Sequence, residues 1–188
     1  MIIKKRIHVA YQLPPGSRWR SMYFWDPVRG CTPISDGCKN CSSARTIGGN
    51  LVDKNFHFNG VLEFNRDALN HKFSNAAQVF VCGRSDLFHE KVPFQFVDEV
   101  LSRIQARPDC QFFMITKRAN RMAEYFGGSE VPKNLWVSVT TENQKYADLR
   151  IPHLAKINGI RILSIKPMLG SINFRQACWV VRCRHSRR

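Results

Sequence analysis

Residues 110–116 read CQFFMIT, a nearly continuous apolar run that is typical of a β-strand buried on both faces. Helical patterns flank this run on both sides. Residues 94–107 place apolar side chains at spacings of three and four, and residues 120–126 form a shorter helical stretch that stops at two glycines. The run therefore belongs to an alternation of strand and helix.

The same alternation extends in both directions along the chain. Apolar strands that alternate with helices pair in parallel through right-handed crossovers, so the predicted fold class is α/β. A complete eight-stranded barrel needs about 250 residues, and this chain has 188. We therefore expect a partial, open, parallel TIM-like barrel of about six βα units, or a C-terminally truncated form of one. Further strands are expected at residues 61–65, 78–83, 135–141 and 160–166, with a weaker one at 177–181, and further helices at 67–73 and 144–157.

The length and composition of the chain indicate one folded domain, and basic residues are frequent at both ends of the sequence. Hydrophobic residues make up 44% of the chain, which is enough for a core. We expect a basic N-terminal arm at residues 1–19, one α/β domain at residues 20–176 and a basic tail at residues 177–188. No apolar run approaches the roughly 18 residues of a membrane span, and no secretory signal is visible. A cytoplasmic protein is expected.

The charge balance favours a polyanionic partner. The chain has 29 Lys and Arg against 14 Asp and Glu, giving a net charge of +15. Such an excess attracts polyanions over about a Debye length, roughly 8 Å at physiological salt. Nucleic acid is the leading partner, without a preference between DNA and RNA, and a membrane surface is not expected. The alternative is that the charge serves solubility alone.

Three of the seven cysteines gather in residues 25–45, WDPVRGCTPISDGCKNCSSAR. Cys31, Cys38 and Cys41 form a C-x6-C-x2-C pattern, with turn-forming residues between them. Thiolates are soft ligands, so the pattern suits an iron-sulfur cluster or a zinc ion with a fourth ligand. Unligated cysteines are the third alternative, whereas an odd cysteine count without an export signal argues against a disulfide framework. The candidates for a fourth zinc ligand are His57, Cys82 and His89.

Polar side chains follow the expected strands. The carboxyl ends of parallel strands meet at one edge, which is where α/β proteins collect functional groups. Neither GxGxxG nor GxxxxGK[ST] follows a strand, so the usual nucleotide-binding motifs are missing. The polar residues concerned are Arg84, Ser85, Asp86, Lys117, Arg118, Thr141, Glu142, Asn143 and Lys166.

Five segments resemble, in order, the successive motifs of the phage-encoded three-Cys-motif protein family. They are WDPVRGCTPISDGCKNC, GRSDLFHEKVP, MITKRANRMAEY, WVSVTTENQKYADLRIPHL and ILSIKPMLGSI, and together they span roughly residues 20–174. That family is usually placed with radical-SAM-like partial TIM barrels, and its molecular function is poorly defined. The resemblance implies a phage or prophage protein of the bacterial cytoplasm, with a three-Cys-motif partner protein encoded alongside it.

The resemblance also implies a cofactor and a set of site residues. Cys31, Cys38 and Cys41 would ligate a [4Fe-4S] cluster whose open iron binds S-adenosylmethionine, which would then be cleaved by one electron. Each polar candidate also has a structural alternative; Asn143, for example, is placed to cap the helix that follows. The implied catalytic residues are Asp86, His89, Lys117 and Glu142, and the implied cofactor contacts are Ser85, Arg118, Asn143 and Lys166.

The chain departs from that family at three places: Ser42 replaces an aromatic residue, Lys166 replaces a glutamate, and residues 178–188 turn basic. Three hypotheses remain open. The first is a radical-SAM-like iron-sulfur protein that modifies nucleic acid or a nucleotide precursor. The second is a zinc-stapled or metal-free nucleic-acid-binding protein, and the third is a catalytically inactive remnant.

Overall fold

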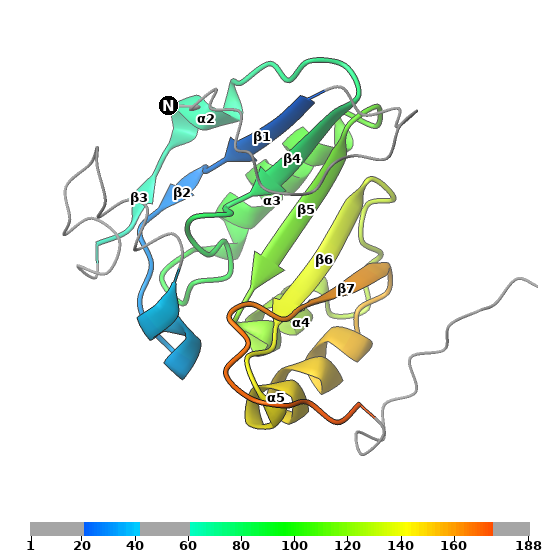
Figure 1. The fold of residues 1–188 in the computed structure, drawn as a ribbon. Helices are drawn as coiled ribbons and strands as arrows, with labels where there is room; N and C mark the ends of the chain where they lie inside the picture. Colours follow the sequence, from blue (N-terminus) through cyan, green and yellow to red (C-terminus); the bar gives the residue numbers. More distant parts are fainter. Residues whose placement is uncertain (1–20, 42–60, 175–188) are drawn as a thin grey trace, which may run out of the picture.

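The computed structural model describes residues 21–41 and 61–174, and a five-stranded parallel sheet forms its centre (Figure 1). The strands lie in the order β1-β4-β5-β6-β7, and every neighbouring pair is parallel. The α/β prediction is confirmed, and the run at residues 110–116 is the central strand. The strands are β1 (Ser21–Trp25), β4 (Ala77–Val81), β5 (Gln111–Thr116), β6 (Leu135–Thr140) and β7 (Ile160–Ser164).

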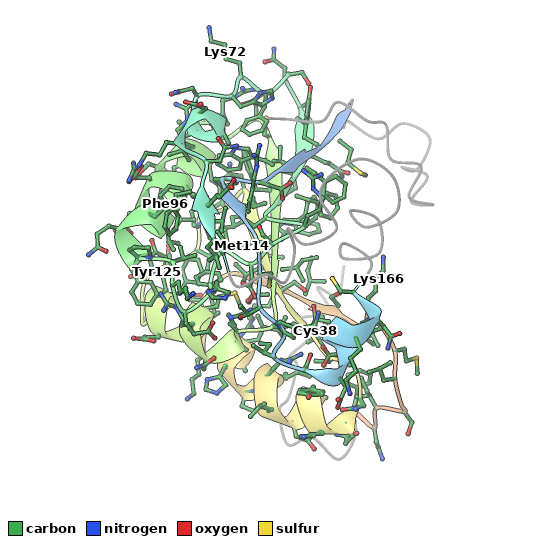
Figure 2. All side chains as sticks on the ribbon, turned by 90° about the vertical axis from the view of Figure 1, so that its left-hand side faces the viewer. Cys38, Lys72, Phe96, Met114, Tyr125 and Lys166 are labelled. Atoms are coloured by element: carbon green, nitrogen blue, oxygen red, sulfur yellow. The ribbon has the colours of Figure 1, made fainter. Side chains whose placement is uncertain are left out.

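Helices α3 (Phe94–Gln105), α4 (Ala119–Phe126) and α5 (Gln144–Ala155) connect successive strands and cover one face of the sheet (Figure 2). Short elements fill the connection between β1 and β4. They are the antiparallel pair β2 (Val28–Arg29) and β3 (Glu63–Phe64), the 3-10 helix η1 (Asp36–Asn40) and the single turn α2 (Arg66–Leu69).

The main core lies between the sheet and these helices. Phe112 and Met114 of β5 point into it with 0% and 1% of their surface exposed. Alternation along each strand sends every second side chain to this side, and the amphipathic helix α3 supplies the opposing layer. Trp25 closes the core at the end of β1, where its Nε1 donates to the Ala68 carbonyl at 2.8 Å.

An aromatic row crosses the other face of the sheet. Phe24, Phe80, Phe113 and Trp136 stand in register on four adjacent strands, with ring centroids 5.4, 5.0 and 5.2 Å apart along the row. All four side chains are half-buried. The predicted burial of the central strand on both faces is therefore confirmed only for the helix-covered face.

Several predicted boundaries differ from the structure. The strand expected at residues 61–65 is only β3, which pairs antiparallel outside the main sheet, so five parallel strands are described instead of about six. Barrel closure is not shown, because β1 and β7 are the two ends of the sheet order. The expected strand at residues 177–181, the arm at 1–19 and the tail at 177–188 lie outside the described residues.

Other boundaries agree to within a few residues. The helix expected at residues 67–73 shortens to α2, and α5 accommodates Pro152 within its length. Within the described ranges, no helix has the length and apolar character needed to cross a membrane.

The neighbouring residues Phe112 and Phe113 allow the two faces to be compared. Phe112→Ala should lower the free energy of unfolding by about 3–5 kcal/mol, because it empties a fully buried site. Phe113→Ala should cost clearly less, since that ring keeps contact with solvent. Urea unfolding of both variants measures the difference. Equal costs would mean that the second face is packed as tightly as the interior of a closed barrel.

Candidate functional site

The cysteine loop, residues 26–41, leaves β1 at the carboxyl end of the sheet, where the segments after β4, β5 and β6 also lie (Figure 2, label Cys38). Two clusters of buried polar side chains fasten this loop to the strand ends. One is centred on Arg118 and the other on Glu142.

Arg118 follows β5, and its guanidinium is almost completely enclosed, with 2% of the side chain exposed. Nη1 donates to Asp86 at 3.1 Å, and Nε contacts both carboxylate oxygens of Glu90 at 2.8 Å. Nη2 donates to the carbonyl and hydroxyl oxygens of Thr32 at 3.2 and 2.9 Å. The second Nη1 donor faces the Cys31 sulfur at 3.8 Å. All five donors of this side chain therefore have partners.

Asp86 and His89 complete the first cluster from the segment after β4. Asp86 is buried and accepts from the Thr116 hydroxyl at 2.7 Å as well as from Arg118. His89 Nε2 lies 2.8 Å from the Thr32 hydroxyl, and its Nδ1 accepts from the Lys91 backbone N–H at 3.1 Å. Because Nδ1 is an acceptor, the neutral ring carries its proton on Nε2 and donates to Thr32.

Glu142 forms the second cluster after β6, with its side chain fully buried. It accepts from the Ser35 hydroxyl at 2.7 Å and from Arg150 at 2.9 Å, and Lys117 Nζ lies 3.9 Å away. The loop backbone presses directly on this carboxylate at Gly37. A Cβ at that position would stand 2.6 Å from both Cγ and Oε1 of Glu142.

A third contact secures the start of the loop. Asp26 forms an ion pair with Arg84, whose Nε donates at 2.8 Å. The Ser85 hydroxyl donates to the Val28 carbonyl at 2.6 Å. The predicted cofactor contact of Ser85 stays a prediction, and its hydroxyl proton already has a backbone acceptor.

The other two predicted site residues lie at the edge of these clusters. Asn143 caps α5, since its Oδ1 accepts from the Tyr146 backbone N–H at 3.2 Å. Lys166 is exposed, and none of the ion pairs between described side chains includes it. Sequence reasoning missed Thr32, Ser35 and Arg150. The partners of Thr32 and Ser35 lie far away in the chain, and those of Arg150 lie eight and ten positions before it, ahead of the helix that carries it.

The sulfurs of Cys31 and Cys38 have hydrogen-bond donors in the first cluster and in the loop. Cys38 is buried on η1 and accepts from the Ile34 backbone N–H at 3.5 Å, with the Ser35 hydroxyl 3.8 Å away. Cys31 is half-buried and faces Arg118. Burial, and then the negative charge of Asp86, raise the pKa of Cys31 to about 11. A metal ion bound there would therefore displace a proton from the thiol.

No convergent single-ion site is present in residues 21–41 and 61–174, where no three His, Cys, Asp or Glu side chains are grouped to hold one metal ion. Both ring nitrogens of His89 already have partners. Cys82 lies buried beyond β4, where burial raises the pKa of its thiol. His57 lies outside the described residues. Neither His89 nor Cys82 is thus seen as a fourth ligand, and the His57 candidate stays a prediction.

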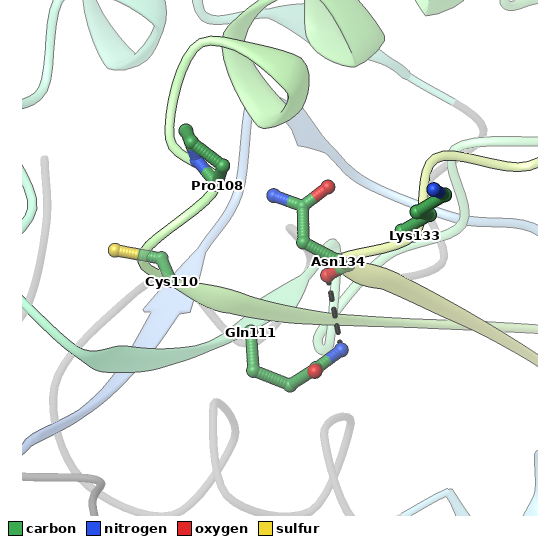
Figure 3. Close-up of a pocket in the computed structure, with 5 residues that line it drawn as sticks. All are labelled: Pro108, Cys110, Gln111, Lys133 and Asn134. Atoms are coloured by element: carbon green, nitrogen blue, oxygen red, sulfur yellow. Dashed lines mark hydrogen bonds between the residues drawn. The ribbon is translucent and has the colours of Figure 1, made fainter.

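A shallow pocket lies at the opposite, amino-terminal end of β5 (Figure 3). Asn134 and Gln111 line it, and both side-chain amides are hydrogen-bonded. Gln111 Nε2 donates to the Asn134 carbonyl at 2.9 Å. Asn134 Nδ2 donates to the carbonyls of Ile104 in α3 and of Arg107 just after it. These contacts join neighbouring elements, so the pocket is assigned to the fold and not to the site.

Gly37→Ala should lower the free energy of unfolding by about 1–3 kcal/mol, because the new methyl group overlaps the buried Glu142 carboxylate. Gly170→Ala is a matched control, since its methyl group would meet only the Asn143 Cβ, at 3.3 Å. Urea unfolding should separate the two variants. Equal midpoints would show that the loop does not rest on Glu142.

Burial, and then the charge of Arg118, lower the pKa of His89; Glu90 and Asp86 oppose this shift, and Lys91 adds to it. As the pH falls, His89 in the unfolded chain therefore binds a proton before His89 in the folded chain does, near the ordinary pKa of about 6.5. The stability that the neutral His89 ring contributes is present above that pKa and is lost as the pH falls from there through the folded-state pKa. His89→Gln should flatten this part of the stability profile in urea titrations between about pH 5 and 8. An unchanged profile would contradict the buried neutral ring.

Comparison with known proteins gives one match. A family model described as "Protein of unknown function (DUF5131)" matches residues 18–186. The searches of curated proteins and of solved structures found no match. The matched region takes in the sheet, the cysteine loop and both polar clusters. The chain therefore belongs to the DUF5131 family of proteins of unknown function.

Proposed function

We propose that this chain is a radical-SAM-like iron-sulfur protein that modifies nucleic acid or a nucleotide precursor, and that it belongs with the phage-encoded three-Cys-motif proteins. One observation carries the proposal: the loop with Cys31, Cys38 and Cys41 is clamped over the carboxyl ends of a parallel sheet by side chains from three successive strand ends. That edge is where α/β enzymes place their chemistry.

The topology supports a partial barrel. The strands follow chain order without reversal, and the described helices lie on one face, whereas a doubly wound sheet reverses its order and has helices on both faces. The aromatic row would then face the barrel interior. The open side between β1 and β7 would leave room for a large substrate.

The donor set fits a cluster better than a single ion. Structural zinc needs four ligands around one point, and the described side chains do not group in that way. Iron-sulfur clusters are held by cysteine thiolates, and the loop would supply three of them, from Cys31, Cys38 and Cys41. The donors to the Cys31 and Cys38 sulfurs would stabilise thiolate charge once a bound metal has displaced the proton that burial and Asp86 keep on Cys31. We therefore favour a [4Fe-4S] cluster, with S-adenosylmethionine at its open iron, over the zinc alternative.

The bound cluster would supply one-electron cleavage of the sulfonium C–S bond and, through it, hydrogen abstraction from substrate. The chain's own residues would divide the remaining work. Arg118, Asp86 and Glu142 hold the loop, and His89 orients Thr32. Lys117 is only loosely paired at 3.9 Å, so it can neutralise an anionic group of the cofactor or substrate.

Charge distribution supports a nucleic-acid partner that is contacted mainly through the ends of the chain. The described ranges hold 17 Lys and Arg against 13 Asp and Glu, so 12 of the 29 basic residues but only 1 of the 14 acidic ones lie elsewhere. Ten of these 12 fall in residues 1–20 and 175–188. Binding through them should weaken steeply with salt. We place the protein in the cytoplasm, where thiols stay reduced.

Protein purified and reconstituted without oxygen should bind iron and sulfide and show a visible iron-sulfur chromophore. Cys38→Ala should lose the chromophore, whereas Cys110→Ala should keep it, because Cys110 is buried near the amino end of β5, away from the loop. Metal analysis and visible spectroscopy measure both results. A wild-type protein that takes up no iron contradicts the proposal, and stoichiometric zinc would favour the alternative.

A further inference from the structure

We propose that Arg118 raises the reduction potential of the iron-sulfur group at the cysteine loop through its contact with the Cys31 sulfur. The inference rests on the proposed function, since it requires a cluster held by Cys31. It gives Arg118 a positioning and tuning role in place of the predicted cofactor contact.

The position of this cation is set by its surroundings. Its Nη1 faces the Cys31 sulfur at 3.8 Å. The remaining donors are held by Asp86, Glu90 and Thr32, and only 2% of the side chain is exposed. Since no donor is left over, the guanidinium cannot turn away from the sulfur without breaking another contact. Among the described side chains, no other guanidinium or ammonium group donates to the sulfur of Cys31 or Cys38.

Reduction adds one electron, delivered by a low-potential one-electron donor, to the cluster and its sulfur ligands; no bond forms or breaks. A fixed cation stabilises this added negative charge more than it stabilises the oxidised form. Hydrogen bonds to sulfur, local charge and burial are among the main determinants of such potentials. Because water is largely excluded from Arg118, its charge is only weakly screened.

Two carboxylates offset the cation, which makes the effect adjustable in both directions. Asp86 is buried and also accepts from Thr116, so its replacement would disturb the fold. Glu90 is 58% exposed, and a glutamine there can still accept from Arg118 Nε. Glu90→Gln therefore removes one negative charge next to the guanidinium while keeping one of the two acceptors of Nε.

The test is an EPR-monitored redox titration of the reconstituted full chain. Arg118→Gln should lower the midpoint potential, reducing the ratio of reduced to oxidised cluster at a fixed ambient potential by about tenfold, equivalent to about 59 mV for one electron. Arg118→Lys keeps the charge but not the planar fork, so its midpoint should lie between those of Arg118→Gln and the wild type. Glu90→Gln should shift the midpoint in the opposite direction, to a higher value.

Arg121→Gln is the matched control. Arg121 lies in the first turn of α4, which Arg118 precedes, and donates to the Glu90 and Val92 carbonyls, so this variant removes a neighbouring positive charge without touching the loop. Its midpoint should stay at the wild-type value. General damage to the fold would not move Arg118→Gln and Glu90→Gln in opposite directions.

The outcomes separate this inference from the proposed function. A wild-type protein that binds no cluster overturns both. A loaded wild-type protein with unchanged midpoints in Arg118→Gln and Glu90→Gln overturns the inference alone. If Arg118→Gln fails to fold or load, Arg118→Lys and Glu90→Gln decide, and unchanged midpoints in those two variants overturn it.

Discussion

The site depends on the enclosure of one positive charge. The Arg118 guanidinium has left water, so each of its donors needs a partner, and the partners come from the cysteine loop and from the segment after β4. Removing one member of a buried ion pair typically costs about 3–5 kcal/mol, because the other charge stays behind unpaired. The loop is thus held in place because the buried guanidinium needs its partners there, and the cysteines of the loop are held in place with it.

The Glu142 cluster holds the loop in the same way, but around a buried negative charge in place of a buried positive one. A fully buried carboxylate is compensated by Arg150 at 2.9 Å and by the Ser35 hydroxyl at 2.7 Å. One cluster therefore places a cation against the first part of the loop, and the other places an anion against its second part. Both are anchored at the carboxyl ends of strands, so the rigidity of the sheet passes directly to the loop.

The sequence was a good guide wherever the signal was local. The apolar run at residues 110–116 and the periodic pattern at residues 94–107 predicted β5 and α3 to within two residues at each end. The strand at residues 61–65 was misjudged because its short apolar pattern does not reveal whether the partner is the main sheet or β2. Burial on the second face depends on which elements cover that face, which no single strand encodes.

The candidate site was predictable as a region but not as a network. Polar residues after parallel strands must approach one another, so Asp86, Arg118 and Glu142 could be named in advance. Their partners could not, since Thr32 and Ser35 lie 86 and 107 positions from the side chains they meet. Residue type also could not show that the side chains of Arg118 and Glu142 bond to the loop, because those bonds become evident only when both side chains are seen to be buried beneath it.

The close approach of Gly37 to Glu142 links two positions that are distant in the chain. There is no space for a side chain at residue 37 while a carboxylate occupies the space above it. The two positions are therefore free to vary only as a pair during divergence: a relative with a larger residue at one position should carry a smaller one at the other. Across the family, this coupling should appear as covariation between the loop and the end of β6.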